Sequence, residues 1–335
     1  MSTSGKTSRD LSKSHLYMKE FELINKGYNS VFKSNELSIG VVIPIENYAQ
    51  STVPTLQHHV ERVQLVEQLG FKAIWVRDVP LHVPSFGDAG QTFDPFTYLG
   101  FLAGQTTKIA LGTGSIALPL HHPIHVAKSA ATIDQLSNGR LILGVASGDR
   151  PSEYPAMGID FEQRGEKFRE AFAYIRKAQE SFPHLETTHY GSLNGKSDIL
   201  PKAAGHKIPM LITGHSRQST EWISEHGDGW IYYPRNDYMQ EYNIAQFREA
   251  IPDTQPFDKP FMQPLYVDLQ EDDDYQPQYI HLGFRIGANR LVEYFQNRKK
   301  LGVNHVAINL RFNTNTIEKT LEQIATKVLP QVSLF

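Results

Sequence analysis

The chain has 335 residues, of which 40% are hydrophobic and 21% are charged, and its formal net charge is -3 at pH 7. This composition is typical of a globular protein with a sizeable core, and it gives no basic field that would favour a nucleic-acid partner. The absence of cysteine excludes disulfides, thiolate nucleophiles and zinc-thiolate sites. Because the first 36 residues lack the apolar core of a secretory signal and no apolar run reaches about twenty residues, we expect a cytoplasmic protein that does not enter a membrane.

Apolar patterning along the chain predicts strands that alternate with helices. An N-terminal extension, residues 1–36, is expected to hold a docking helix at about residues 16–24, and the near-continuous apolar run at 37–45 is typical of a strand buried on both faces. Further strands are expected at residues 72–79, 109–117, 141–146, 208–213, 230–233, 261–269 and 306–310. Helices are expected at residues 56–69, 95–105, 123–136, 162–182, 219–225, 238–250 and 282–301, with a last one ending near Val328. A polar excursion or a hairpin is expected at residues 185–201.

Residues 108–148 show the unit from which the fold is built. A strand, a helix opened by Pro123 and stopped at Gly139, and a second strand follow one another without a long loop. Such a unit is a parallel crossover, and about eight strands in this alternation match a closed barrel. With no internal repeat or linker, we predict the α/β fold class: a single (β/α)8 TIM barrel over residues 37–330, with an N-terminal extension and loop insertions.

In such a barrel the active site lies at the C-terminal ends of the strands. That rule selects residues 77–78, 114–115, 146–149, 214–216 and 230–233. The small residues at two of these ends leave room for a ligand. Asp78 is a carboxylate that ends an otherwise apolar strand, so it can be a general acid or base or a cofactor contact, and an ion pair with Arg77 is equally compatible.

Residues 214–219 lie between a strand and a helix, where backbone N–H groups favour a phosphate. Ser216 and Arg217 would add side-chain donors to such a site. An ordinary turn with Ser219 as the helix N-cap explains the same residues equally well.

Three other motifs give weaker evidence for a function. Residues 112–117 match the G-x-G-x-x-A dinucleotide fingerprint, and Asp134 lies at about the right distance, but the apolar run continues and prolines block a helix until Pro123. The histidines at 121, 122 and 125 have no carboxylate at ligand spacing, so no metal site is predicted. Asp134 and Arg140 are expected to form a structural ion pair.

Residues 113–148 resemble the signature of the bacterial luciferase-like flavin monooxygenases. The matching residues are Leu118-Pro119, His122-Pro123, Ala127-Lys128, Asp134, Leu136-Ser137, Gly139-Arg140 and Gly144. Residues 216–222 and 227–230 are similar to the family's phosphate-binding turn and the strand after it. The resemblance covers residues 37–328.

The resemblance implies a barrel that binds FMN, or in a sister branch a deazaflavin, over the strand ends. It implies a non-prolyl cis peptide between Gly114 and Ser115 against the flavin ring. The remaining cofactor-binding candidates are Ala146, Ser147 and Gly148 beside the ring, His215, Ser216 and Arg217 at the phosphate, and Trp230. The catalytic candidates, as contacts to substrate or oxygenated flavin, are Arg77, Asp78 and Arg150.

The implied reaction is oxidation of a small organic substrate by reduced FMN and dioxygen. Since the chain shows no separate nicotinamide site, an NAD(P)H-dependent flavin reductase is the expected partner, and a homodimer or larger homo-oligomer is expected. The chain departs from the luciferases where they carry a catalytic histidine, because Asp78-Val79 stands there, which argues against aldehyde luminescence. A deazaflavin-dependent dehydrogenase and a non-catalytic flavin-binding protein remain alternatives.

Overall fold

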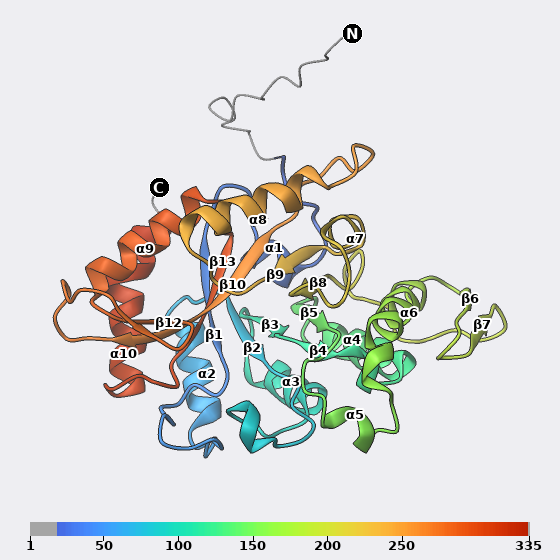
Figure 1. Cartoon of the computed structure of the whole chain (residues 1–335), viewed down its shortest axis with the longest axis horizontal. Helices are drawn as coiled ribbons and strands as arrows, with labels where there is room; N and C mark the ends of the chain where they lie inside the picture. Colours follow the sequence, from blue (N-terminus) through green and yellow to red (C-terminus); the bar gives the residue numbers. More distant parts are fainter. Residues whose placement is uncertain (1–18, 334–335) are drawn as a thin grey trace, which may run out of the picture.

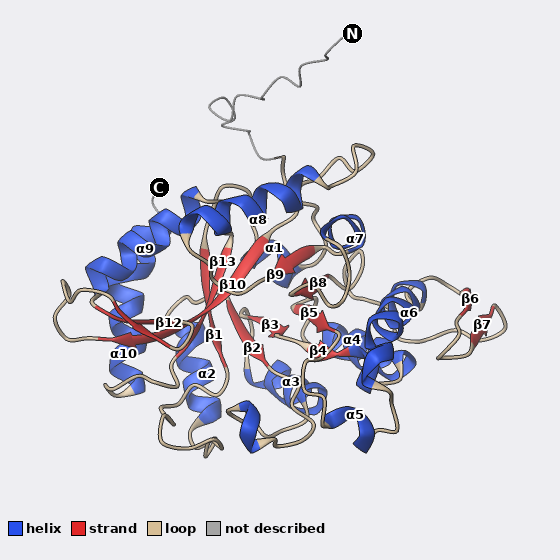
Figure 2. Ribbon diagram, viewed as in Figure 1, coloured by secondary structure: helices blue, strands red, loops and turns tan. Residues whose placement is uncertain are grey.

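The computed structural model of the protein describes residues 19–333, and its centre is a closed parallel barrel (Figures 1 and 2). The barrel strands are β1 (Ser38–Val42), β2 (Ala73–Val76), β3 (Ala110–Thr113), β5 (Leu141–Ala146), β8 (Met210–Thr213), β9 (Gly229–Ile231), β10 (Phe261–Leu269) and β13 (His305–Asn309). They neighbour one another in this order, β9 pairs with β10, and β13 pairs with β1 to close the ring. The predicted (β/α)8 barrel is therefore confirmed.

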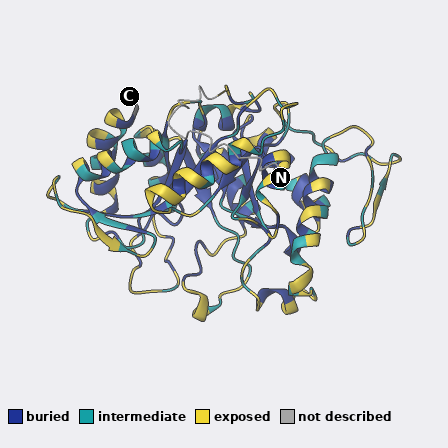
Figure 3. Ribbon diagram, turned by 45° about the horizontal axis from the view of Figure 1, so that its top comes forward, coloured by how far each residue is buried: buried dark blue, intermediate teal, exposed yellow. Residues whose placement is uncertain are grey.

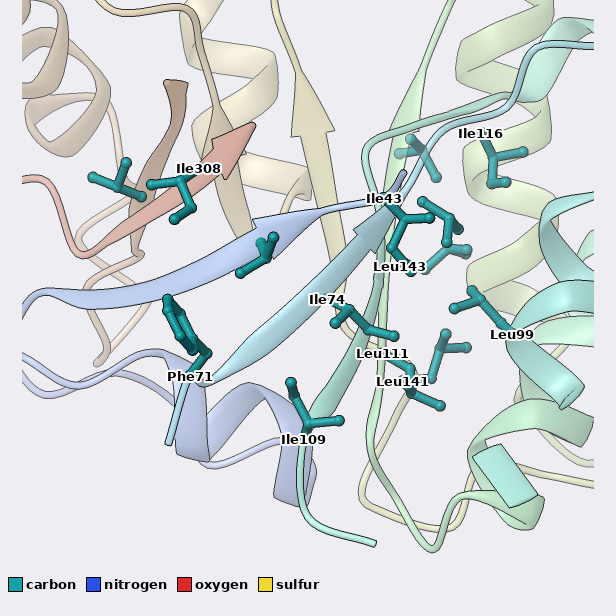
Figure 4. Close-up of a cluster of buried hydrophobic side chains, with 14 of the residues drawn as sticks. Ile43, Phe71, Ile74, Leu99, Ile109, Leu111, Ile116, Leu141, Leu143 and Ile308 are labelled. Carbon is teal, nitrogen blue, oxygen red and sulfur yellow. The ribbon is translucent and has the colours of Figure 1, made fainter. Parts of the chain in front are cut away.

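Helices surround the barrel, and their inner faces pack on it (Figure 3). They are α2 (His59–Gln68), α3 (Pro95–Gln105), α4 (Pro123–Leu136), α6 (Arg164–Lys177), α7 (Thr220–His226), α8 (Asp237–Glu249), α9 (Ala288–Lys300), α10 (Ile317–Gln323), the π-helical turn η4 (Ile324–Val328) and α11 (Leu329–Ser333). Figure 4 shows part of the apolar layer between strands and helices, where Ile74 and Leu111 of the sheet lie near Leu99 of α3. No helix within residues 19–333 is long and apolar enough to cross a membrane.

The N-terminal segment closes the barrel at the N-terminal ends of its strands. The helix expected at residues 16–24 is wrong for its described part, since Phe21 forms a β-bridge with Asp258 and helix α1 (Lys26–Val31) begins later; residues 16–18 lie outside the described residues. Asn25 starts α1 because its side chain accepts a hydrogen bond from Tyr28 N. The apolar side chains of this segment join the cluster inside the barrel: Phe21, Ile24, Tyr28, Val31 and Phe32.

Insertions extend the barrel at several loops. Short elements follow the strands on the C-terminal side: η1 (Pro84–Phe86), β4 (Ile116–Ala117), η2 (Leu118–Leu120), α5 (Glu153–Ala156) and η3 (Phe161–Gln163). The expected polar hairpin is β6 (His184–Glu186) with β7 (Ser192–Asn194), which stands away from the barrel in Figure 1.

A second hairpin was not predicted. β11 (Gln278–Ile280) and β12 (Gly283–Ile286) add to the outer edge of β10, so the helix expected from residue 282 starts only at Ala288. At Gly283 a Cβ atom would lie 1.8 Å from Tyr266 O, so only glycine permits this pairing.

The turn between α4 and β5 is held without the expected ion pair. Asp134 accepts hydrogen bonds from Asn25 Nδ2, Leu141 N and Ala204 N. Arg140, 5% exposed, donates to oxygens of Ala103, Thr106, Ile109 and Ser137. The prediction of an Asp134–Arg140 pair is wrong, because the Asp134 carboxylate is bonded to the Asn25 amide and to backbone N–H groups, and the Arg140 guanidinium is bonded to backbone and hydroxyl oxygens.

Candidate active site

A cavity of about 640 Å³ opens at the C-terminal ends of the barrel strands. This is where the strand-end rule places an active site, and the volume is in the ordinary range of small-molecule sites. Its floor is formed by apolar side chains from inside the barrel: Val42, Trp75, Ile231, Met262 and Ala307. The walls are formed by the loops that follow the strands.

Trp75 is fixed in the floor by a chain of hydrogen bonds. Its indole N–H donates to Nε2 of His305 at 3.0 Å, so the ring proton of His305 is on Nδ1 and is donated to Ser38 Oγ at 2.6 Å. The Ser38 hydroxyl in turn donates to Val31 O at 2.7 Å. Because His305 is fully buried, its pKa falls from 6.5 to about 3, and the ring is neutral.

Small residues form two walls of the cavity. The Gly114–Ser115 peptide is cis, as the resemblance implies, and the Ser115 and Thr213 hydroxyls are hydrogen-bonded to each other. Both Gly114 and Ser115 line the cavity, and so do Ala146, Ser147 and Gly148 after β5. Gly148 has a φ of +75°, and a Cβ there would lie 2.7 Å from the Tyr154 hydroxyl, so this wall requires glycine.

The turn after β8 presents backbone rather than side chains to a ligand. Gly214, Ser216 and Arg217 have φ angles of 57°, 47° and 62°. No described residue accepts a hydrogen bond from the backbone N–H of His215, Ser216 or Arg217. Successive free N–H groups in such a turn form an anion-binding concavity. His215 and Ser216 line the cavity.

The two side chains expected to bind phosphate are directed elsewhere. The Ser216 hydroxyl donates to Thr213 O at 2.8 Å and accepts from Ser147 N at 3.2 Å, so its proton is used by the scaffold. The Arg217 side chain is 55% exposed, lies 3.9 Å from Glu162, and does not line the cavity.

Trp230 supports this turn from behind and does not line the cavity. It is 1% exposed, and its indole N–H donates to Gly214 O at 2.7 Å. Its ring centroid lies 5.6 Å from that of His215. The structure therefore gives Trp230 a positioning place in the site.

Arg77, Asp78 and Arg150 all line the cavity, but Arg77 does not pair with its neighbour in the chain. Arg77 Nη1 lies 2.8 Å from Oδ1 of Asp88, whose other oxygen accepts from the Tyr48 hydroxyl and lies 2.9 Å from Arg311 Nη1. Burial alone would raise the pKa of Asp88, but Arg77 and these hydrogen bonds outweigh it and lower the pKa.

Asp78 pairs instead with His121, one of the three histidines to which the sequence assigned no metal site. Asp78 Oδ2 lies 2.7 Å from His121 Nε2 and accepts from Ala117 N at 3.0 Å. Burial would lower the pKa of His121, but the hydrogen bond and charge of Asp78 outweigh it and raise the pKa.

Arg150 lies near a second buried carboxyl. Its Nη1 is 3.9 Å from Glu153 Oε1, its Nη2 donates to Asp88 O at 3.4 Å, and its guanidinium lies over the Phe86 ring. Burial raises the pKa of Glu153 in spite of Arg150. Asp88, Glu153 and Arg311 were all missed from the sequence; only Arg311 follows a predicted strand, so the strand-end rule could have selected it.

Metal-ligand geometry occurs once among residues 19–333, away from the cavity. Glu166, Glu170 and His189 lie close enough to hold an ion. Both Glu170 oxygens already accept hydrogen bonds, from Thr188 N and His189 N. This arrangement caps the backbone of the loop before β7.

The cavity residues fit a flavin-type cofactor. A flat ring can lie over the apolar floor between the two walls of small residues, and the free N–H groups at 215–217 suit a phosphate. Residues 37–318 match the family model described as luciferase-like monooxygenase.

Individual relatives point the same way. The alkanal monooxygenase beta chain of Photorhabdus luminescens is 30% identical over 198 residues, which cover 57% of this chain and 57% of that one. The oxygenase component of the flavin-dependent trigonelline monooxygenase of Acinetobacter baylyi is 25% identical over 260 residues, 74% of this chain and 68% of that one. Among solved structures, an F420-dependent secondary alcohol dehydrogenase in complex with an F420-acetone adduct superposes with a TM-score of 0.72 at 19% identity, covering 89% of this chain and 99% of that one, which shows a shared fold.

Proposed function

Since the chain belongs to the luciferase-like monooxygenase family, we propose that it is an FMN-dependent monooxygenase that oxidises a small organic substrate. The observation that carries the proposal is the combination of small-residue walls with the free backbone N–H groups at 215–217, all around one cavity. The chemistry that FMN would supply when bound in its reduced form is the reduction of dioxygen, with one oxygen atom entering the substrate.

In this proposal each part of the cavity has a separate task. Gly114 and Ser115 would hold the ring from one wall of the cavity, and residues 146–148 from the other. The amides of residues 215–217 hold the phosphate, with Trp230 and Ser216 keeping the turn in place. The apolar floor around Trp75 would exclude water from the cofactor.

The Arg77–Asp88–Arg311 cluster and Arg150 form a charged wall of the cavity that would face a substrate. Arg77 is held in one position by Asp88, and the backbone of Arg77 is bonded to the Gln91 side chain at both its N–H and its carbonyl. Such fixed side chains orient a substrate without reorganisation cost. Asp78 is a carboxylate of this wall whose second oxygen has no hydrogen-bond partner among the described residues, so we propose that this oxygen exchanges a proton with a substrate.

We propose that reduced FMN comes from a separate NAD(P)H-dependent reductase. The trigonelline enzyme, which is described as an oxygenase component, supports a divided system of this kind. The homodimer or larger homo-oligomer and the cytoplasmic location expected from the sequence stay predictions.

A deazaflavin-dependent dehydrogenase is the second candidate, and the superposition with an F420-bound dehydrogenase favours it. Titrating the purified protein with FMN and with F420, followed by fluorescence, separates the two. Tighter binding of FMN, together with oxygen-dependent turnover, supports the monooxygenase. Tighter binding of F420 refutes it.

The phosphate site is tested by Gly214→Val. A β-branched residue at φ +57° strains the turn by about 1–2 kcal/mol, and leaving this conformation turns the free N–H groups away. We expect the Kd of FMN to rise about tenfold and that of riboflavin, which has no phosphate, to stay unchanged. Gly191→Val is the matched control, because Gly191 has a φ of +73° in the distant β6–β7 hairpin. Equal weakening of FMN and riboflavin would refute the assignment.

A further inference from the structure

A second depression lies outside the barrel, on the other side of the wall that contains Asp78. This groove, of about 440 Å³, runs between α3 and α4, and Asp94, Gly100, His121, His125 and Lys128 are among the residues that line it. Asp78 lines the cavity and His121 lines the groove. One hydrogen bond of 2.7 Å joins them across the wall.

The pair is fixed but open at both ends. The side chain of Asp78 is 3% exposed, and its Oδ2 is held by Ala117 N as well as by His121 Nε2. The side chain of His121 is 26% exposed. Neither Asp78 Oδ1 nor His121 Nδ1 has a hydrogen-bond partner among the described residues. A carboxylate and an imidazole can each take up a proton at one atom and release it from another.

We propose that Asp78 and His121 form a proton relay that connects the cavity with the groove. This inference rests on the proposed function. The N–H bond at His121 Nε2 breaks and an O–H bond forms on Asp78, which then releases that proton to a basic atom in the cavity. This leaves His121 as a neutral imidazole that keeps its Nδ1 proton. When the hydrogen bond to Asp78 opens, Nε2 takes a new proton from the solvent of the groove, and the imidazolium is restored.

The proposed reaction consumes such a proton. Without a substrate, the reduced FMN anion, dioxygen and one proton give oxidised FMN and hydrogen peroxide. With a substrate, the same three reactants give oxidised FMN, water and a product that carries one oxygen atom. A cofactor and a substrate bound in the cavity would exclude bulk water, and a route through the wall would then supply the proton.

The charged groups around His121 favour its protonated form. Asp78 lies on the cavity side and Asp94 precedes α3, and both raise the pKa of His121. His125 and Lys128 of α4 also line the groove. Glu153 lies on the cavity side of Asp78, close enough for Asp78 to raise its pKa.

The relay is tested with His121→Ala and the matched control His125→Ala, which removes a histidine from the same groove but leaves the pair intact. Protein loaded with FMN is reduced by dithionite, mixed with dioxygen, and followed by stopped-flow absorbance. We expect His121→Ala to slow the oxidation of bound FMN by about 100-fold, imidazole in the buffer to restore the rate, and His125→Ala to match the wild type. Asp78→Asn should be slowed as well and not restored.

A measurement on the cofactor-free protein tests the pair itself. Titration of the histidines by NMR should give His121 a pKa above 6.5, and Asp78→Asn should lower it. The relay is refuted if FMN bound to His121→Ala is oxidised at the wild-type rate. It is also refuted if imidazole fails to restore the rate of a slowed variant, since free imidazole replaces a proton carrier but not a merely structural histidine. Wild-type protein that binds no flavin refutes the proposed function and the relay together, whereas binding with unaltered His121→Ala kinetics refutes the relay alone.

Discussion

His305, beneath the cavity floor, should make the stability of the barrel depend on pH. Its pKa is about 3 in the folded protein and 6.5 in the unfolded chain. Between these values the unfolded chain binds a proton that the folded protein excludes, so stability is present in full above pH 6.5 and is lost as the pH falls toward 3. The variant that tests this is His305→Gln, because a glutamine oxygen can accept from Trp75 and its amide can donate to Ser38, without titrating.

The size of the effect follows from the two pKa values. Between pH 8 and pH 5, His305 should cost the wild type about 2 kcal/mol of unfolding free energy, since one proton changes it by about 1.4 kcal/mol per pH unit below 6.5. Other titrating groups are common to both proteins and cancel in the difference. Cofactor-free wild type and variant are unfolded in urea at pH 8, 6.5 and 5, and the wild type should lose about 2 kcal/mol more than the variant by pH 5. Parallel pH profiles would refute a neutral, buried His305.

Two further substitutions probe the frame of the site. Arg140→Leu should lower the free energy of unfolding by about 3 kcal/mol or more, because it removes the charged donors from several buried oxygens. Arg140→Lys should lower the free energy of unfolding by less. Equal losses of stability in the two variants would contradict the role of the guanidinium group. Gly144→Ala should cost more than about 2 kcal/mol in urea unfolding, because its Cβ would lie 2.0 Å from Thr113 O. Gly104→Ala, which meets nothing within 4 Å in α3, is the control and should be neutral or slightly stabilising.

The barrel was predictable because its strands are buried on both faces, and a doubly buried strand leaves an apolar run that any reader of the chain can find. The elements missed were those with mixed sequences. β12 contains Arg285 and follows His281, so its pattern does not separate it from the helix behind it; only pairing with β10 makes it a strand. The helix expected at about residues 16–24 is replaced by one that starts only at Lys26, because Asn25 is a strong N-cap.

Within the site, the backbone features were predictable and the side-chain partners were not. Glycines and small residues at strand ends indicate where a ligand fits, because backbone conformation and side-chain size depend on the residue itself and its neighbours in the chain. Partners such as Asp78 and His121 lie 43 positions apart and meet only because β2 and β3 are neighbours in the barrel. Because Arg77 and Asp78 are neighbours in the chain, an ion pair between them was considered. Successive residues at a strand end point to opposite sides, so Arg77 pairs with Asp88 and Asp78 pairs with His121.

The N-terminal segment, which closes the barrel at the N-terminal ends of its strands, also determines where this protein can be truncated. The family match begins at residue 37, yet Tyr28 is hydrogen-bonded to Asp228 O, and Val31 receives the last hydrogen bond of the chain that starts at Trp75. A protein expressed from residue 37 would expose the N-terminal end of the barrel. It would also leave the Ser38 hydroxyl, which is bonded to His305, without its acceptor Val31 O. For anyone designing a shortened or fused version, the first strand is therefore too late a starting point.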